Sequence, residues 1–156
     1  MGHSINVFIG KDNIISLFSF EQKVSKITLN QGFSMVFLSC NFHEELLREY
    51  KGELVCDNLF VNFDSAVKSL LEKYSSGGML AYMETDYFGG VGSQTAILYE
   101  NGRLRISPIQ TNDFTLWTKD DNRAINIILK ELGVKKEDDF DEFDSVGLNG
   151  YRRMSD

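Results

Sequence analysis

The stretch from Met79 to Ile106 carries the clearest strand pattern in the chain. An apolar run leads into Glu84-Thr85-Asp86-Tyr87-Phe88, a glycine-rich segment covers 89–92, and a second β-prone run covers Gln94 to Tyr99. Asn101-Gly102 follows, which is typical of a tight hairpin because both central positions of a type I′ turn need positive φ. A third alternating run comes after it. The pattern predicts the centre of a sheet, with a glycine-rich connection at one end.

Shorter runs of β-branched and aromatic residues predict further strands. One pair of runs, separated by Asn30-Gln31-Gly32, is expected to form a hairpin. The predicted strands are Ser4 to Ile9, Lys23 to Leu29, Phe33 to Ser39 and, as a short edge strand, Leu54 to Phe60; Pro108 to Thr118 is predicted to be irregular or an edge strand.

Apolar residues at helical spacing, flanked by capping residues and glycines, predict the helices. The first follows Asn41, with Leu46, Leu47 and Tyr50 on its buried face. The predicted helices are Asn41 to Gly52, Asn62 or Asp64 to Tyr74, and about Asp120 to Gly133; Asp12 to Phe20 suits a strand or a short helix, of which the helix is favoured. The less regular tail from Val134 onward is expected to lay an apolar edge on the domain while its acids stay exposed.

Together these elements predict an α+β fold, a mostly antiparallel sheet of about five to seven strands with about three helices packed on it. The 156 residues (1–156) are expected to form a single domain that buries roughly two-thirds of its unfolded surface. No apolar run reaches the ~20 residues of a membrane span, and the first residues do not resemble a secretory signal. We therefore expect a cytoplasmic protein with no membrane contact, and reduced, buried thiols at Cys40 and Cys56.

The formal net charge is −7, and the acids are unevenly distributed. Residues 137–144 contain six acids and no base, and the rest of the chain is nearly neutral. No basic stripe of the kind that binds phosphates is present, which argues against a nucleic-acid partner. The acidic segment is either a solvated surface or a docking surface for a basic protein partner. Its candidate partner-binding residues are Asp138, Asp139, Asp141 and Glu142.

The glycine-rich segment is the candidate small-ligand site. Carboxylates two residues apart on a strand share one face, and glycines expose backbone N–H groups that can cradle phosphate or carboxylate. The spacing matches neither the dinucleotide fingerprint nor the P-loop, so a simple glycine-rich strand connection is the structural alternative. The candidate ligand-binding residues are Glu84, Asp86, Tyr87, Gly89, Gly90, Gly92 and Gln94.

Metal and catalytic motifs are weak. Cys40, His43, Cys56 and His3 lack the second paired ligand set of a structural zinc site. A Cys40 nucleophile with His43 as its base lacks an indicated orienting Asp or Asn, and His43 suits an exposed helix start better. The sequence therefore predicts no catalytic residue, no metal and no cofactor.

Tyr82 to Ala96 (YMETDYFGGVGSQTA), Ala124 to Val134 and the Asp-Glu-Phe-Asp-x-x-Gly-Leu sequence near the C-terminus resemble a group of small uncharacterised bacterial proteins that carry an ETDYFGGxGxQ motif. The resemblance covers about the C-terminal half of the chain. It implies no established activity and no catalytic residue. In size and acidity the chain is also similar in general character to immunity proteins of toxin–immunity systems.

The leading functional hypothesis is a non-enzymatic bacterial protein-binding module, such as an immunity protein that neutralises a basic toxin domain. The alternative is a small-ligand or phosphate-binding enzyme centred on the glycine-rich loop. A third hypothesis is a structural module of a larger assembly. The oligomeric state stays open.

Overall fold

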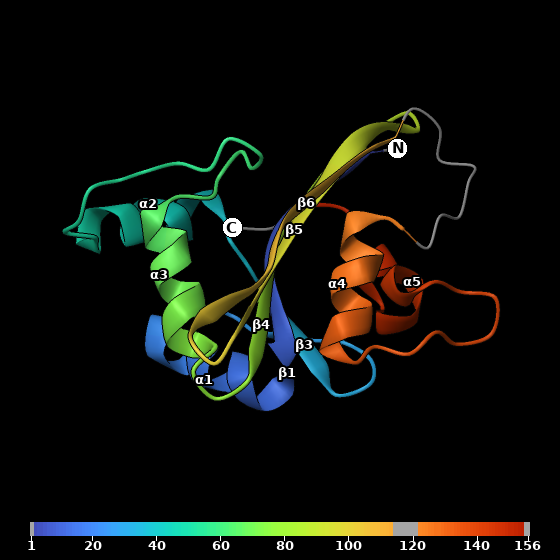
Figure 1. Cartoon of the computed structure of the whole chain (residues 1–156), viewed down its shortest axis with the longest axis horizontal. Coiled ribbons are helices and arrows are strands. Elements are labelled where there is room, and N and C mark those ends of the chain that lie inside the picture. The colour runs from blue at the N-terminus through green and yellow to red at the C-terminus, as the bar shows by residue number, and fades with distance from the viewer. Residues whose placement is uncertain (1, 114–121, 155–156) are drawn as a thin grey trace.

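A computed structural model describes residues 2–113 and 122–154. Its centre is an antiparallel sheet (Figure 1), whose six strands lie in the order β2-β3-β1-β4-β5-β6. The strands are β1 His3–Lys11, β2 Ile27–Thr28, β3 Phe33–Phe37, β4 Met79–Phe88, β5 Val91–Glu100 and β6 Arg103–Asp113. The predicted α+β class and the interior position of the two strands around the glycines are confirmed.

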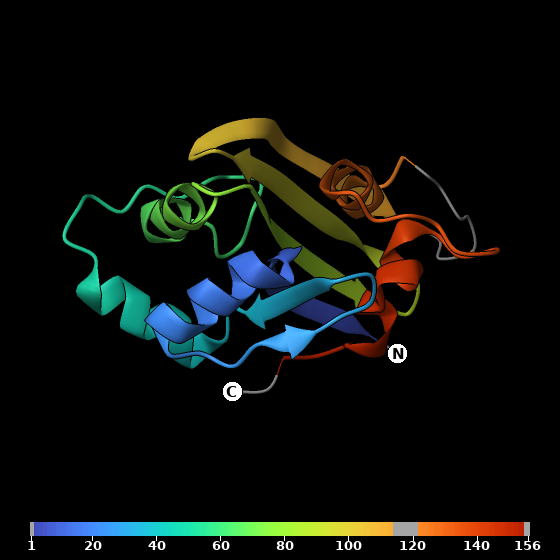
Figure 2. The same ribbon diagram turned by 90° about the horizontal axis from the view of Figure 1, so that it is seen from below.

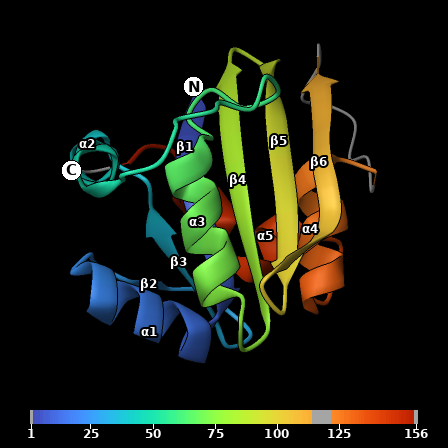
Figure 3. The ribbon, with the colours of Figure 1, turned by 60° about the vertical axis from the view of Figure 1, so that its left-hand side comes forward.

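Helices cover both faces of this sheet (Figures 2 and 3). We call the two sides the α3 face and the α4 face. The α3 face carries α1 Asp12–Gln22, α2 Cys40–Glu49 and α3 Ser65–Tyr74; the α4 face carries α4 Ala124–Leu132, α5 Glu142–Val146 and the 3₁₀ helix η1 Leu148–Gly150. The described residues thus contain more helices than the sequence predicts, because the tail, predicted to be less regular, folds into α5 and η1.

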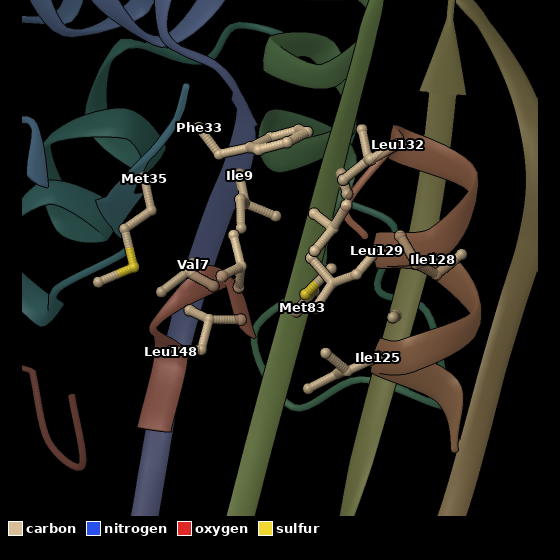
Figure 4. Packing of buried hydrophobic residues seen from close by; sticks show 14 of the residues in the cluster. Val7, Ile9, Phe33, Met35, Met83, Ile125, Ile128, Leu129, Leu132 and Leu148 are labelled. Atoms are coloured by element: carbon tan, nitrogen blue, oxygen red, sulfur yellow. The ribbon is translucent and has the colours of Figure 1, made fainter. Parts of the chain in front are cut away.

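Each face of the sheet has its own hydrophobic core. The residues of α4 that pack on β4 and β5 are Ile125, Ile128, Leu129 and Leu132 (Figure 4). On the α3 face aromatic rings dominate: the ring centroid of Phe8 lies 4.9 Å from that of Phe18 and 5.1 Å from that of Tyr82. Burial on both faces explains why the central strands read as nearly continuous apolar runs.

The glycine cluster forms the turn between β4 and β5. Gly89 and Gly90 have φ angles of 61° and 90°, and Phe88 and Val91 pair directly on either side of them. Positive φ at both central residues is the requirement of a type I′ hairpin turn, which side chains with a Cβ rarely meet. The Asn101-Gly102 turn between β5 and β6 repeats this geometry, as predicted.

The predicted helix starts are right for α3 and wrong by two residues for α2. Asp64, one of the two predicted caps, begins α3, and its Oδ1 accepts hydrogen bonds from the amides of Ala66 and Val67 at 3.0 Å each. In α2, Ser39 is the cap in place of Asn41, because its hydroxyl accepts from the amide of Phe42. The predicted inner face of α2 is only half-buried, since this helix lies at the periphery of the sheet.

The segment between α2 and α3 departs most from the prediction. Leu54 to Phe60 forms no strand, and only Cys56 makes an isolated bridge, to Asp64. Cys40 and Cys56 are exposed, so the expectation of buried thiols is wrong. Cys40 is the first residue of α2, at the periphery of the sheet, and Cys56 lies in the long loop between α2 and α3.

Of the two predictions for the stretch after Pro108, irregular structure or an edge strand, residues 108–113 adopt the edge strand, as part of β6. β6 is an edge strand that includes Pro108, a position where a missing N–H costs little. The rest of the stretch to Thr118, and the helix start predicted near Asp120, lie outside the described residues. Helix α4 ends at Gly133, as predicted, with a φ of 105° at that glycine.

The described C-terminal residues run beside the first half of β1. The short strand β3 pairs only with residues 7–11 of β1. Next to the uncovered part, the amide of Ser4 donates to the carbonyl of Arg152 at 2.8 Å, and the amide of Asn6 donates to the sulfur of Met154 at 3.2 Å. The tail therefore completes one side of the central strand.

Candidate functional site

A cavity of about 460 Å³ lies at the end of the sheet where the β4–β5 turn meets the beginnings of β1, α4 and α5. We call it the glycine-turn pocket. Figure 1 shows the N-terminus beside the tip of the β4–β5 hairpin, with the start of α4 at the same end of the molecule. The residues that line it are Gly2, His3, Thr85, Tyr87, Gly89, Gly90, Gln94, Arg123, Asn126, Asp141, Phe143, Asn149 and Arg152.

Strand alternation decides which side chains reach this pocket. Thr85 and Tyr87 point to the α4 face of β4, and Gln94 is paired with Thr85 on β5. Glu84 and Asp86 have the opposite parity and lie on the α3 face. The two carboxylates that the sequence places beside the glycines are therefore separated from the pocket by the sheet itself.

Gln94 fastens the start of α4 to the sheet. Its Oε1 accepts a hydrogen bond from the amide of Ile125 at 2.8 Å, and its Nε2 donates to the hydroxyl of Tyr87 at 3.0 Å. From β6, the hydroxyl of Thr111 accepts from the amide of Ala124 at 2.9 Å. No side chain of the cap residue itself bonds these amides, so the strands satisfy N–H groups that a helix start leaves open.

His3 forms one wall of the pocket. Its Nδ1 lies 2.7 Å from the hydroxyl oxygen of Thr85, and its ring packs edge-on against Phe143 with centroids 5.3 Å apart. Burial lowers the pKa of His3; the nearby charge of Arg152 adds to this shift, and the carbonyl of Leu148 opposes it. His3 is therefore neutral near pH 7. Its buried Nε2 has no hydrogen-bond partner within the described part of the chain.

The charged groups of the pocket are two arginines and one carboxylate. Arg123 precedes α4, and Arg152 belongs to the tail beside β1. The carboxylate of Asp141 is already engaged: Oδ1 accepts from the amide of Asp144 at 2.9 Å and Oδ2 from the Asn126 side chain at 3.1 Å. Two guanidinium groups against one carboxylate leave the lining with one net positive charge, in a chain whose formal net charge is −7.

The predicted ligand residues divide into two groups. Tyr87, Gly89, Gly90 and Gln94 line the pocket. Gly92 does not; an added Cβ there would lie 2.1 Å from the Asp86 carbonyl oxygen, so this glycine is required by the close approach of the strands. His3, Arg123 and Arg152 were missed, because no local motif links residues that tertiary structure brings together.

Glu84 and Asp86, the other predicted ligand residues, lie on the α3 face. Asp86 is exposed. Glu84 is buried and holds the long loop down: the amides of Val61 and Asn62 donate to its carboxylate at 3.0–3.3 Å. Burial raises the pKa of Glu84 above its ordinary 4.5, although those two amides and the Tyr82 hydroxyl act in the opposite direction.

The acidic segment is only partly a surface. Asp138 and Asp139 are exposed. Asp141 caps α5, and Glu142, at 4% exposure, is buried against the expectation that the acids stay in solvent. The sequence pattern did not predict α5, and Asp141 and Glu142 lie at the start of this helix.

The environment of His43 also differs from the prediction. Its Nε2 lies 2.7 Å from Oδ2 of Asp64, so an orienting acid is present and the ring is largely buried. Among the described residues no group of His, Cys, Asp and Glu is placed to hold a metal ion.

Comparison of the chain with protein-family models, with curated proteins and with solved structures finds no match. Within residues 2–113 and 122–154, none of the helices has both the length and the apolar character needed to cross a bilayer.

Replacing Gln94 with Met is expected to lower the free energy of unfolding by about 1–3 kcal/mol, because the Ile125 amide loses its buried acceptor. Urea denaturation measures this change. The matched control is Asn13→Met at an exposed position of α1, for which a change within about 0.5 kcal/mol is expected. Equal effects of the two substitutions would contradict the role assigned to Gln94.

Glu84→Gln is expected to change how stability depends on pH. Because its pKa is raised in the folded state, Glu84 binds a proton more tightly there than in the unfolded chain. This adds stability as the pH falls toward 4.5 and removes it as the pH rises through the raised pKa. Relative to the Gln variant, the wild type should gain free energy of unfolding between neutral pH and about 4.5, the ordinary value. Urea unfolding at several pH values measures it; a pH-independent difference would contradict the assignment.

Proposed function

We propose that the glycine-turn pocket binds a small organic anion with a planar or apolar body. The observation that carries this proposal is the convergence of Arg123, Arg152 and His3 on one cavity of about 460 Å³. That volume is in the range of small-molecule sites, roughly 300–1,000 Å³. The proposal concerns binding, and no reaction is assigned.

The two arginines of the lining indicate a negatively charged ligand. Guanidinium groups pair with carboxylate or phosphate through parallel, charge-assisted hydrogen bonds. The backbone at Gly89 and Gly90 lines the same cavity and has no side chain to block a close approach.

The aromatic side chains in the pocket lining indicate what kind of uncharged group the ligand carries. The rings of Tyr87 and Phe143 line the cavity, and aromatic faces favour flat or apolar groups. Gln94 and Asn126 also line it, but their amides already hold α4 and α5 in place. They are expected to shape the pocket, with little role in recognising charge.

A second candidate function is the protein-binding module, of which an immunity protein for a basic toxin domain is one form. The exposure of Asp138 and Asp139 in a segment without regular structure favours it. Asp141 and Glu142 support it less, because capping and burial occupy them.

The test of the pocket uses ligand-observed NMR and thermal shift with benzoate and phenyl phosphate, each paired with a neutral analogue, benzamide or phenyl acetate. The anions are expected to bind and the neutral analogues to bind at least about tenfold more weakly, a difference of ~1.4 kcal/mol. Arg152→Gln should weaken anion binding by a similar factor.

The control is Arg103→Gln, which removes an exposed arginine at the far end of β6 and should leave binding unchanged. Equal binding of charged and neutral probes, or an equal loss in both variants, would overturn the proposal.

A further inference from the structure

An exposed apolar surface lies on the α3 face, at the hairpin end of the sheet. Its side chains are Leu59, Val61, Phe88 and Val91, with exposed fractions of 43%, 86%, 79% and 50%. We call it the Val61–Phe88 surface. Exposed apolar groups that gather on one face of a folded domain often mark interaction sites.

The register of β4 and β5 places Phe88 beside Val91, and the loop places Leu59 and Val61 farther along the same face. Phe88 is paired with Val91 on the same side of the hairpin as Asp86 and Glu84. The amide of Val61 is bonded to Glu84, four residues from Phe88, a span of about 14 Å along a strand. Figure 3 shows the loop before α3 crossing the sheet near this end.

The loop that carries Leu59 and Val61 is anchored at several points. Its carbonyl at Leu59 accepts from the hydroxyl of Thr95 and from the side chain of Gln110, at 3.3 and 3.2 Å. Together with the Glu84 contacts, these bonds hold the loop while the Val61 side chain stays in solvent. A loop that is already fixed in the unbound protein loses little conformational freedom when a partner binds.

The segments that form this surface carry acids and no bases. Residues 52–64 and 77–101 contain no Lys, Arg or His, but of their acids Glu84 and Asp64 are buried and Glu100 pairs with Arg105 at the other end of β5. Asp86 is exposed between the loop and the tip of the hairpin, and Asp57 is partly exposed in the loop. Complementarity therefore selects a cationic partner.

We propose that the Val61–Phe88 surface docks a basic segment of a partner protein, whose apolar residues cover Val61 and Phe88 and whose lysines or arginines meet Asp86. The surface is on the opposite side of the hairpin from the glycine-turn pocket, so the two proposals are independent. It is also separate from the acidic segment that contains Asp138 and Asp139.

The test measures fluorescence anisotropy of a labelled synthetic peptide of alternating leucine and lysine, with a leucine–glutamate peptide as its charge-reversed counterpart. The lysine peptide is expected to bind, more weakly as salt rises, and the glutamate peptide is not. The double substitution Val61→Ser, Phe88→Ser should weaken binding at least about tenfold. Both positions are exposed, so the variant should stay folded; circular dichroism checks this.

Three variants serve as controls. Leu17→Ser with Phe20→Ser removes apolar residues that are exposed on α1, Asp138→Asn with Asp139→Asn neutralises the acidic segment, and Arg152→Gln alters only the pocket. All three should bind the lysine peptide as the wild type does, whether or not the pocket proposal holds.

Other outcomes overturn the proposal. An equal loss in the α1 control indicates non-specific adhesion, and a loss confined to the Asp138 and Asp139 variant moves docking to the acidic segment. Concentration-dependent dimers in sedimentation, abolished by the Val61 and Phe88 substitutions, would make a second copy of this chain the occupant.

Discussion

Burial of the sheet on both faces is the constraint on which the rest of the structure depends. Because helices pack on each side, every residue of β4 and β5 is committed by its parity to one of two separate environments. A single hairpin thus supplies a pocket wall on one side, through Tyr87, and an anchored loop on the other, through Glu84. The glycine-turn pocket and the Glu84 contacts therefore lie on opposite faces of the sheet.

Two polar side chains of the hairpin connect it to elements outside the sheet. Gln94 holds the beginning of α4, and Glu84 holds the loop before α3. Both are buried, and both satisfy main-chain N–H groups that no backbone carbonyl reaches. Their positions explain why polar residues interrupt strands that are otherwise apolar.

Local signals in the sequence are sufficient for much of the fold. The positive-φ turns at Gly89-Gly90 and Asn101-Gly102 follow from residue type alone, and residue type narrows the cap of α3 to Asn62 or Asp64. The prediction of a short edge strand from Leu54 to Phe60 is wrong. The apolar residues of this segment resemble a strand pattern, but in the structure they belong to a loop and several of them face solvent.

The candidate site was less predictable for a physical reason. Parity along β4 separates Glu84 from Tyr87, and this could be read from the chain once a strand was accepted. The contributions of His3 and Arg152 could not, since they depend on β1 pairing with β4 and on the tail returning beside β1. Such long-range contacts leave no periodic trace in a single sequence.

The return of the tail to β1 has a consequence for handling the protein. Residues 152–154 occupy the side of β1 that β3 leaves uncovered, and so satisfy main-chain groups at Ser4 and Asn6. Removing these residues, or drawing them away with a fused tag, would expose an unpaired stretch of the central strand. Unpaired strands recruit one another, so such an altered chain is prone to aggregation by strand addition between copies.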